Sequence, residues 1–155
     1  MTPILVLGIG NILLRDEGVG VHVVQEIQKR TAPEGVEVCD GGTFGIDLID
    51  TIAGRRKVIV IDAVQADAAP GTVLKFGPED MAAKEIRDMS LHQLGLLETL
   101  TMAQQLGCAP DEVVIFGIVP KEITPGLELS AEVAAVVPKV VELVMAELTQ
   151  TPSGD

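Results

Sequence analysis

The chain has 155 residues, of which 47% are apolar and 2% aromatic, and it carries a formal net charge of −12. This length fits one domain with a real core, and no charge-free apolar run of about 18 residues is present, so we expect no membrane-spanning helix. The negative charge repels phosphate backbones, and without Trp or Tyr the chain lacks most platforms on which bases stack, so nucleic acid is not an expected partner.

The first half of the chain alternates between short apolar runs and amphipathic stretches. Arg55, Arg56 and Lys57 follow the second predicted helix, where cations suit a helix C-terminus, and we assign them no functional role. In chain order the predicted elements are a strand over 4–8, a helix over 17–30, a strand over 36–39, a turn over 40–43, a helix over 45–53, a strand over 58–61 that ends at Asp62, and an edge strand over 72–76.

The second half begins with a polar, mixed stretch over 77–89, which is long enough to be a loop. Ser90-Leu91-His92-Gln93 matches a capping box, with Ser at the N-cap and Gln three residues later, and predicts a helix that runs to about Leu106. A buried strand over 113–119 follows, and a helix over 131–148 whose apolar face continues across Pro138, so we expect one kinked helix there.

Apolar strands that alternate with helices predict a parallel sheet that is covered on both faces. We therefore predict an α/β fold, a single-domain three-layer αβα sandwich. Its mostly parallel, twisted sheet has about five strands, one of them an antiparallel edge strand. The domain should span 1–148, and the polar tail over 149–155 should fray.

The segment GIGNILLRDEGVG begins like a dinucleotide-binding loop, but the position of the third glycine is occupied by Leu13. The acidic pair Asp16-Glu17 would also repel a pyrophosphate at the start of the helix. Nucleotide binding is therefore disfavoured, and we interpret Asp16 as an N-cap and nothing more.

Ligands of open α/β sheets bind at the carboxyl ends of the strands. Glu17 follows the first predicted strand, Asp40 follows the second, and Asp62 ends the third, whereas His92 opens a helix that can reach the same edge. A carboxylate at the end of a buried strand is costly unless it is hydrogen-bonded, paired or bound to a cation. Each residue alone is most simply structural, but Glu17, Asp62 and His92 together predict a metal site.

Five segments carry a resemblance that covers nearly the whole chain. They are ILVLGIGNILLRDEGVGVHVV, CDGGTFGIDLID, VIVIDAV, MSLHQLGL and FGIVPKEITPGLELS, and the first and fourth together are quite specific. With these segments the chain resembles the [NiFe]-hydrogenase maturation endopeptidases. The resemblance implies a protease that cuts a short C-terminal extension from the large-subunit precursor after nickel has been inserted.

The resemblance also implies roles for individual residues. Glu17, Asp62 and His92 match the metal contacts of the family, which is thought to need no metal of its own and to recognise nickel carried by the substrate. Zinc or cadmium could occupy the same site in vitro. The resemblance also implicates Asp40 in substrate handling or cleavage. The residues that we expect to contact the substrate are Gly41, Gly42, Thr43 and Gln93.

The chain has no familiar protease signature, neither a Gly-x-Ser-x-Gly elbow nor a His-Glu-x-x-His helix. Water must then be activated by a metal or by a carboxylate, as in an aspartyl protease, and the sequence does not choose among Glu17, Asp40 and Asp62 as general base. Two alternatives stay open, a zinc-dependent metallohydrolase with its own metal and a non-catalytic sensor or chaperone of metal loading. We expect a cytoplasmic monomer that has neither membrane nor nucleic acid as a partner.

Overall fold

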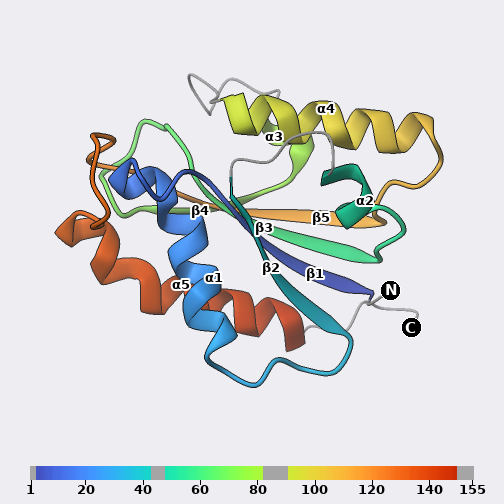
Figure 1. Cartoon of the computed structure of the whole chain (residues 1–155), viewed down its shortest axis with the longest axis horizontal. Coiled ribbons are helices and arrows are strands. Elements are labelled where there is room, and N and C mark those ends of the chain that lie inside the picture. Colours follow the sequence, from blue (N-terminus) through green and yellow to red (C-terminus); the bar gives the residue numbers. More distant parts are fainter. Residues whose placement is uncertain (1–2, 43–47, 82–90, 150–155) are drawn as a thin grey trace.

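The computed structural model describes residues 3–42, 48–81 and 91–149, and of Gly42, Met81 and residues 91–94 it describes the backbone alone. A five-stranded sheet lies between two layers of helices (Figure 1). Its strands are β1 (Ile4–Ile9), β2 (Val36–Gly42), β3 (Lys57–Ala63), β4 (Val73–Phe76) and β5 (Glu112–Ile118), in the order β2-β1-β3-β5-β4.

The pairs β1–β2, β1–β3 and β3–β5 are parallel, and only the edge strand β4 runs antiparallel, against β5. This arrangement confirms the predicted fold class. The strand order reverses between the neighbouring strands β1 and β3, because the chain goes outward from β1 to β2 and then returns to β3 on the other side of β1. The carboxyl ends of these strands therefore form the edge at which a ligand is expected.

The helices are η1 (Arg15–Gly18, a 3₁₀ turn), α1 (Val19–Gln28), α2 (Leu48–Ile52), α3 (Pro78–Met81), α4 (Leu91–Gln105) and α5 (Ala131–Thr149). The helices α1 and α5 cover one face of the sheet, and α2 and α4 cover the other (Figure 1). Along β3, Ile59 and Ile61 pack on the α1/α5 side, whereas Val58 and Val60 pack on the α2/α4 side. Both faces of β3 are buried, which explains why this strand is apolar along most of its length.

Two predicted boundaries were wrong. The helix predicted over 17–30 begins as the 3₁₀ turn η1, and α1 starts only at Val19. The turn predicted over 40–43 is a continuation of β2 as far as Gly42, because Asp40 pairs with Gly8 and Gly42 pairs with Ile9 in the ladder with β1. Glycines signalled a turn in the sequence, but here the pairing with β1 decides the conformation.

The other elements follow the prediction closely. The helix α4 ends at Gln105, and α5 is one helix with Pro138 inside it. The stretch predicted as a loop over 77–89 contains the short helix α3, while Ser90 of the capping box and the tail 150–155 lie outside the described residues. In the described part of the chain, no helix combines the length and the apolar character needed to cross a bilayer.

Of the three cations after α2, Lys57 has a role that the sequence did not indicate. Arg55 donates from Nε to the Thr51 carbonyl at the end of α2, as cations at a helix C-terminus do. Lys57 instead begins β3, is 4% exposed and forms an ion pair with Glu147 of α5, which is equally buried. This pair ties the amino end of the sheet to the last helix.

Candidate functional site

Gly10 brings the loop after β1 and the end of β3 together. Its φ is +130°, and a Cβ at this position would lie 2.0 Å from the Glu17 carbonyl oxygen and 3.7 Å from Asp62 Oδ1. No side chain fits in that gap, so only glycine allows η1 to lie against the end of β3. The backbone of Glu17 and the carboxylate of Asp62, which are far apart in sequence, therefore lie close together at the carboxyl edge of the sheet.

Gly20 explains how α1 is held at the same edge. A Cβ at Gly20 would lie 2.1 Å from the Ile61 carbonyl oxygen and 2.6 Å from the Ile9 carbonyl oxygen. The first turn of α1 thus contacts the backbone of β1 and β3 directly. The glycines of this segment serve the close packing of helix and loop on the sheet, a use that needs no bound phosphate.

Asp62 is the most deeply buried carboxylate at the edge apart from Asp16, with 1% exposure. Its Oδ1 accepts a hydrogen bond of 2.8 Å from the Ala63 N–H. The alternation of β3 places Asp62 on the same face as Val58 and Val60, the face covered by α2 and α4. That face is also the one on which the helix of His92 lies.

His92 and Gln93 belong to the first turn of α4, whose N-terminus lies toward the half of the molecule in which the parallel strands end (Figure 1). Their side chains lie outside the described part of the structure. Among the side chains that the structure describes, no group of three His, Cys, Asp or Glu residues could hold a metal ion together. The His92 imidazole is not one of these described side chains. The Glu17/Asp62/His92 metal site therefore stays a prediction.

Asp40 lies at the same edge but toward the other face. It is exposed, and it pairs with Gly8 at the end of β2. Val36 and Val38 pack on the α1/α5 side, so the alternation of the strand places Asp40 on that side. Of the expected substrate residues beside it, Gly41 packs against the Leu7 side chain, Gly42 pairs in the ladder, and Thr43 lies outside the described residues.

Asp16 is not an N-cap, contrary to the interpretation of the sequence. The caps of η1 and α1 are Leu14 and Gly18, and neither makes a side-chain capping bond. Asp16 is fully buried. Its carboxylate accepts four hydrogen bonds, from the N–H groups of Lys121, Glu122 and Ser130 and from the Ser130 hydroxyl, at 2.7–2.8 Å.

These bonds decide the charge of Asp16. Burial by itself raises the pKa of its carboxyl, but the hydrogen bonds donated by Glu122, Ser130 and Lys121 outweigh it and hold the pKa below its ordinary value. Asp16 is therefore a charged anchor that fixes the 121–130 segment to the loop carrying Glu17. Its partners are more than a hundred residues away in sequence, so no local pattern could have revealed this role.

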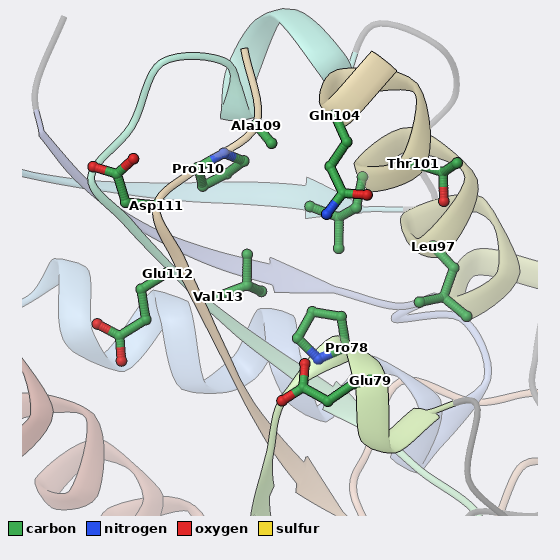
Figure 2. Close-up of a pocket in the computed structure, with 11 residues that line it drawn as sticks. Pro78, Glu79, Leu97, Thr101, Gln104, Ala109, Pro110, Asp111, Glu112 and Val113 are labelled. Atoms are coloured by element: carbon green, nitrogen blue, oxygen red, sulfur yellow. The ribbon is translucent and has the colours of Figure 1, made fainter. Parts of the chain in front are cut away.

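A pocket of about 490 Å³ lies at the opposite end of the sheet. Figure 2 shows Pro78, Glu79 and Gln104 around it, from α3 and α4, together with the start of β5 at Glu112 and Val113. Asp62 pairs with Gly117, near the other end of β5. The pocket is therefore separate from the edge at which Glu17 and Asp62 meet.

Comparison with known proteins identifies the class. The family model for hydrogenase maturation proteases matches residues 21–147. The hydrogenase 2 maturation protease of Escherichia coli (strain K12) is 37% identical over 150 residues, which are 96% of this chain and 92% of that protein.

Solved structures agree with this relationship. The hydrogenase maturating endopeptidase HybD from E. coli matches with a TM-score of 0.87 at 37% identity, over 94% of this chain and 91% of that one. The [NiFe] hydrogenase maturation protease HybD from Thermococcus kodakarensis matches with a TM-score of 0.78 at 32% identity, over 94% and 99% of the two chains. The protein is thus an endopeptidase, and it belongs to the hydrogenase maturation protease family.

Proposed function

We propose that this protein removes the C-terminal extension from the large-subunit precursor of a [NiFe] hydrogenase, and that Glu17, Asp62 and His92 recognise the nickel that the precursor carries. The observation that carries the proposal is the close approach of the Glu17 backbone and the Asp62 carboxylate beside Gly10, at the sheet edge where α/β proteins bind ligands. It is supported by the similarity to a [NiFe] hydrogenase maturation protease.

The donor set suits this task. Two carboxylates and an imidazole are ligands that divalent nickel or zinc accepts. Three protein ligands leave coordination positions open, so a metal held by the substrate's own ligands can still be contacted. In this proposal the nickel belongs to the substrate and shows that the precursor is loaded, because an unfilled precursor would not hold its scissile bond against the edge.

Hydrolysis requires a base that takes a proton from water while the water oxygen bonds to the scissile carbonyl carbon. It also requires an acid that returns a proton to the departing amide nitrogen. Glu17, Asp40 and Asp62 are the candidate carboxylates at this edge, and Asp62 lies on a different face of the sheet from Asp40. This separation favours a division of roles, in which Asp62 and Glu17 contact the metal and Asp40 handles the peptide or activates water.

The test is a nickel-loaded precursor incubated with the protein, with mass spectrometry to detect release of a C-terminal peptide. Glu17→Gln, Asp62→Asn and His92→Ala should each strongly reduce release while circular dichroism shows a folded chain. Full activity in all three variants would refute the assignment. Stoichiometric zinc that survives a chelator would support a resident metal, and binding without release would support a sensor.

The cytoplasmic location, the monomeric state and the absence of nucleic acid or membrane partners stay predictions.

A further inference from the structure

Most of the large apolar side chains that the described residues expose are gathered on two loops. Six such side chains are exposed by 38% or more, and four of them lie in the loop after β1 or in the loop between β5 and α5. These four are Ile12 (40%), Leu13 (61%), Ile123 (38%) and Leu127 (65%), and we refer to them as the apolar patch.

The two loops lie side by side because their backbones are hydrogen-bonded. The Gly126 N–H donates to the Leu13 carbonyl at 2.9 Å, and the Arg15 N–H donates to the Gly126 carbonyl at 3.0 Å. The Asp16 N–H donates to the Glu122 carbonyl at 3.0 Å. Figure 1 shows the two loops together at the end of the molecule where the parallel strands end.

The patch is also held in place before any partner arrives. The buried Asp16 carboxylate binds the N–H groups of Lys121, Glu122 and Ser130, which flank Ile123 and Leu127 on both sides. Arg15 adds a bond from Nε to the Glu128 carbonyl at 3.0 Å. A preorganised apolar surface loses little conformational entropy on binding, which is a property of docking sites.

The patch borders the candidate site. Leu13 is four residues from Glu17, and Ile12 packs on η1 itself, since a Cβ at Gly18 would lie 2.6 Å from the Ile12 Cα. A protein that presents a peptide to Glu17 and Asp62 must therefore cover or adjoin the patch. Scattered exposed apolar residues need no explanation, but a cluster beside a site indicates a protein partner.

We propose that the apolar patch docks a complementary apolar surface on the folded body of the hydrogenase precursor, next to the segment that is cut. This inference rests on the proposed function and adds the surface by which the substrate is selected. Its contribution is to binding and not to the chemical step, because none of the four side chains can move a proton.

The experiment uses single-turnover cleavage of nickel-loaded precursor with the enzyme in excess, so that the half-saturation concentration and the maximal rate are measured separately. The test variant is Leu13→Gln with Leu127→Gln. The matched control is Met102→Gln with Leu106→Gln, which removes two side chains of similar exposure (42% and 67%) near the end of α4. Direct binding of the precursor to each variant is measured by biolayer interferometry.

The test variant should raise the half-saturation concentration by about tenfold or more and leave the maximal rate within about twofold, while the control changes neither. An unchanged half-saturation concentration, an equal effect of the control, or a fall in maximal rate alone would overturn the proposal.

If wild-type protein binds the precursor without cutting it, the proposed function fails, and the direct binding measurement on the variants still decides the role of the patch. A wild type that does not bind the precursor overturns the docking proposal. So does a concentration-dependent dimer that the test variant abolishes, because the patch would then join two copies of this chain.

Discussion

Replacing Asp16 by Asn changes the charge of the buried anchor without creating a cavity. In the wild type, Asp16 Oδ2 accepts hydrogen bonds from the Lys121 and Glu122 N–H groups and the Ser130 hydroxyl, and Oδ1 accepts the Ser130 N–H. An asparagine can keep its oxygen at the position of Oδ2, but its NH₂ group must then face the Ser130 N–H. One buried donor is left without an acceptor, and the other three bonds lose their charged partner.

The magnitude follows from these contacts. A buried unsatisfied N–H costs about 1–3 kcal/mol, and the weakening of three charge-assisted bonds adds to it, so Asp16→Asn should lower the free energy of unfolding by about 3 kcal/mol or more. For a domain of this size, that corresponds to a Tm lower by about 6–12 °C. Urea unfolding followed by circular dichroism measures the free energy, and a thermal scan measures the Tm.

Ser130→Ala is the matched control for Asp16→Asn. It removes only the hydroxyl donor and leaves the carboxylate with its backbone donors, so its cost should be about 1 kcal/mol. If Asp16→Asn costs no more than Ser130→Ala, Asp16 is not the charged anchor that its hydrogen bonds indicate.

Two further predictions concern pH and backbone packing. Burial opposes ionisation of the Glu147 carboxyl, but the hydrogen bonds from Lys57 and Lys75 outweigh it and lower its pKa below the ordinary value of 4.5. The ionised Glu147 therefore stabilises the folded protein above pH 4.5, and this stabilisation is lost as the pH falls through the lower pKa of the folded state. Acid unfolding curves of the wild type and Glu147→Gln should therefore converge at low pH, and a constant gap would contradict this. Gly10→Ala should cost about 3 kcal/mol or displace Glu17 and reduce precursor cleavage, because the new Cβ would lie 2.0 Å from the Glu17 carbonyl oxygen. Gly107→Ala, also at positive φ but with nothing within 4 Å, should cost only about 1 kcal/mol and keep activity, and equal costs for the two would remove the argument from packing.

The sequence was sufficient for the fold because the central strands β1, β3 and β5 are apolar on both faces, and because α1 and α5 each carry an apolar stripe. It was less informative where tertiary pairing competes with local signals. The glycines after Asp40 suggested a turn, yet pairing with β1 extends β2 as far as Gly42. The short helix α3 was missed because four residues carry no periodic pattern.

At the candidate site, too, the sequence was informative about some residues and not about others. The rule about carboxyl ends of strands pointed to Glu17 and Asp62, and the Glu17 backbone carbonyl and the Asp62 carboxylate both lie beside Gly10, while their role as metal ligands stays a prediction. It did not separate Asp40 from Asp62, since the face on which Asp40 lies depends on how far β2 continues. The role of Asp16 could not be predicted, because all of its side-chain hydrogen bonds come from a segment that the local sequence does not specify.

The long sequence separation between Asp16 and Ser130 also has a consequence for synthesis. A ribosome releases β1 and Glu17 early, but the N–H and hydroxyl donors that bind the Asp16 carboxylate emerge only after most of the chain has been made. Closing such a distant contact is slow and comes late in folding. The loop that carries Glu17 is therefore fixed to the rest of the sheet edge only after the segment over 121–130 has been made.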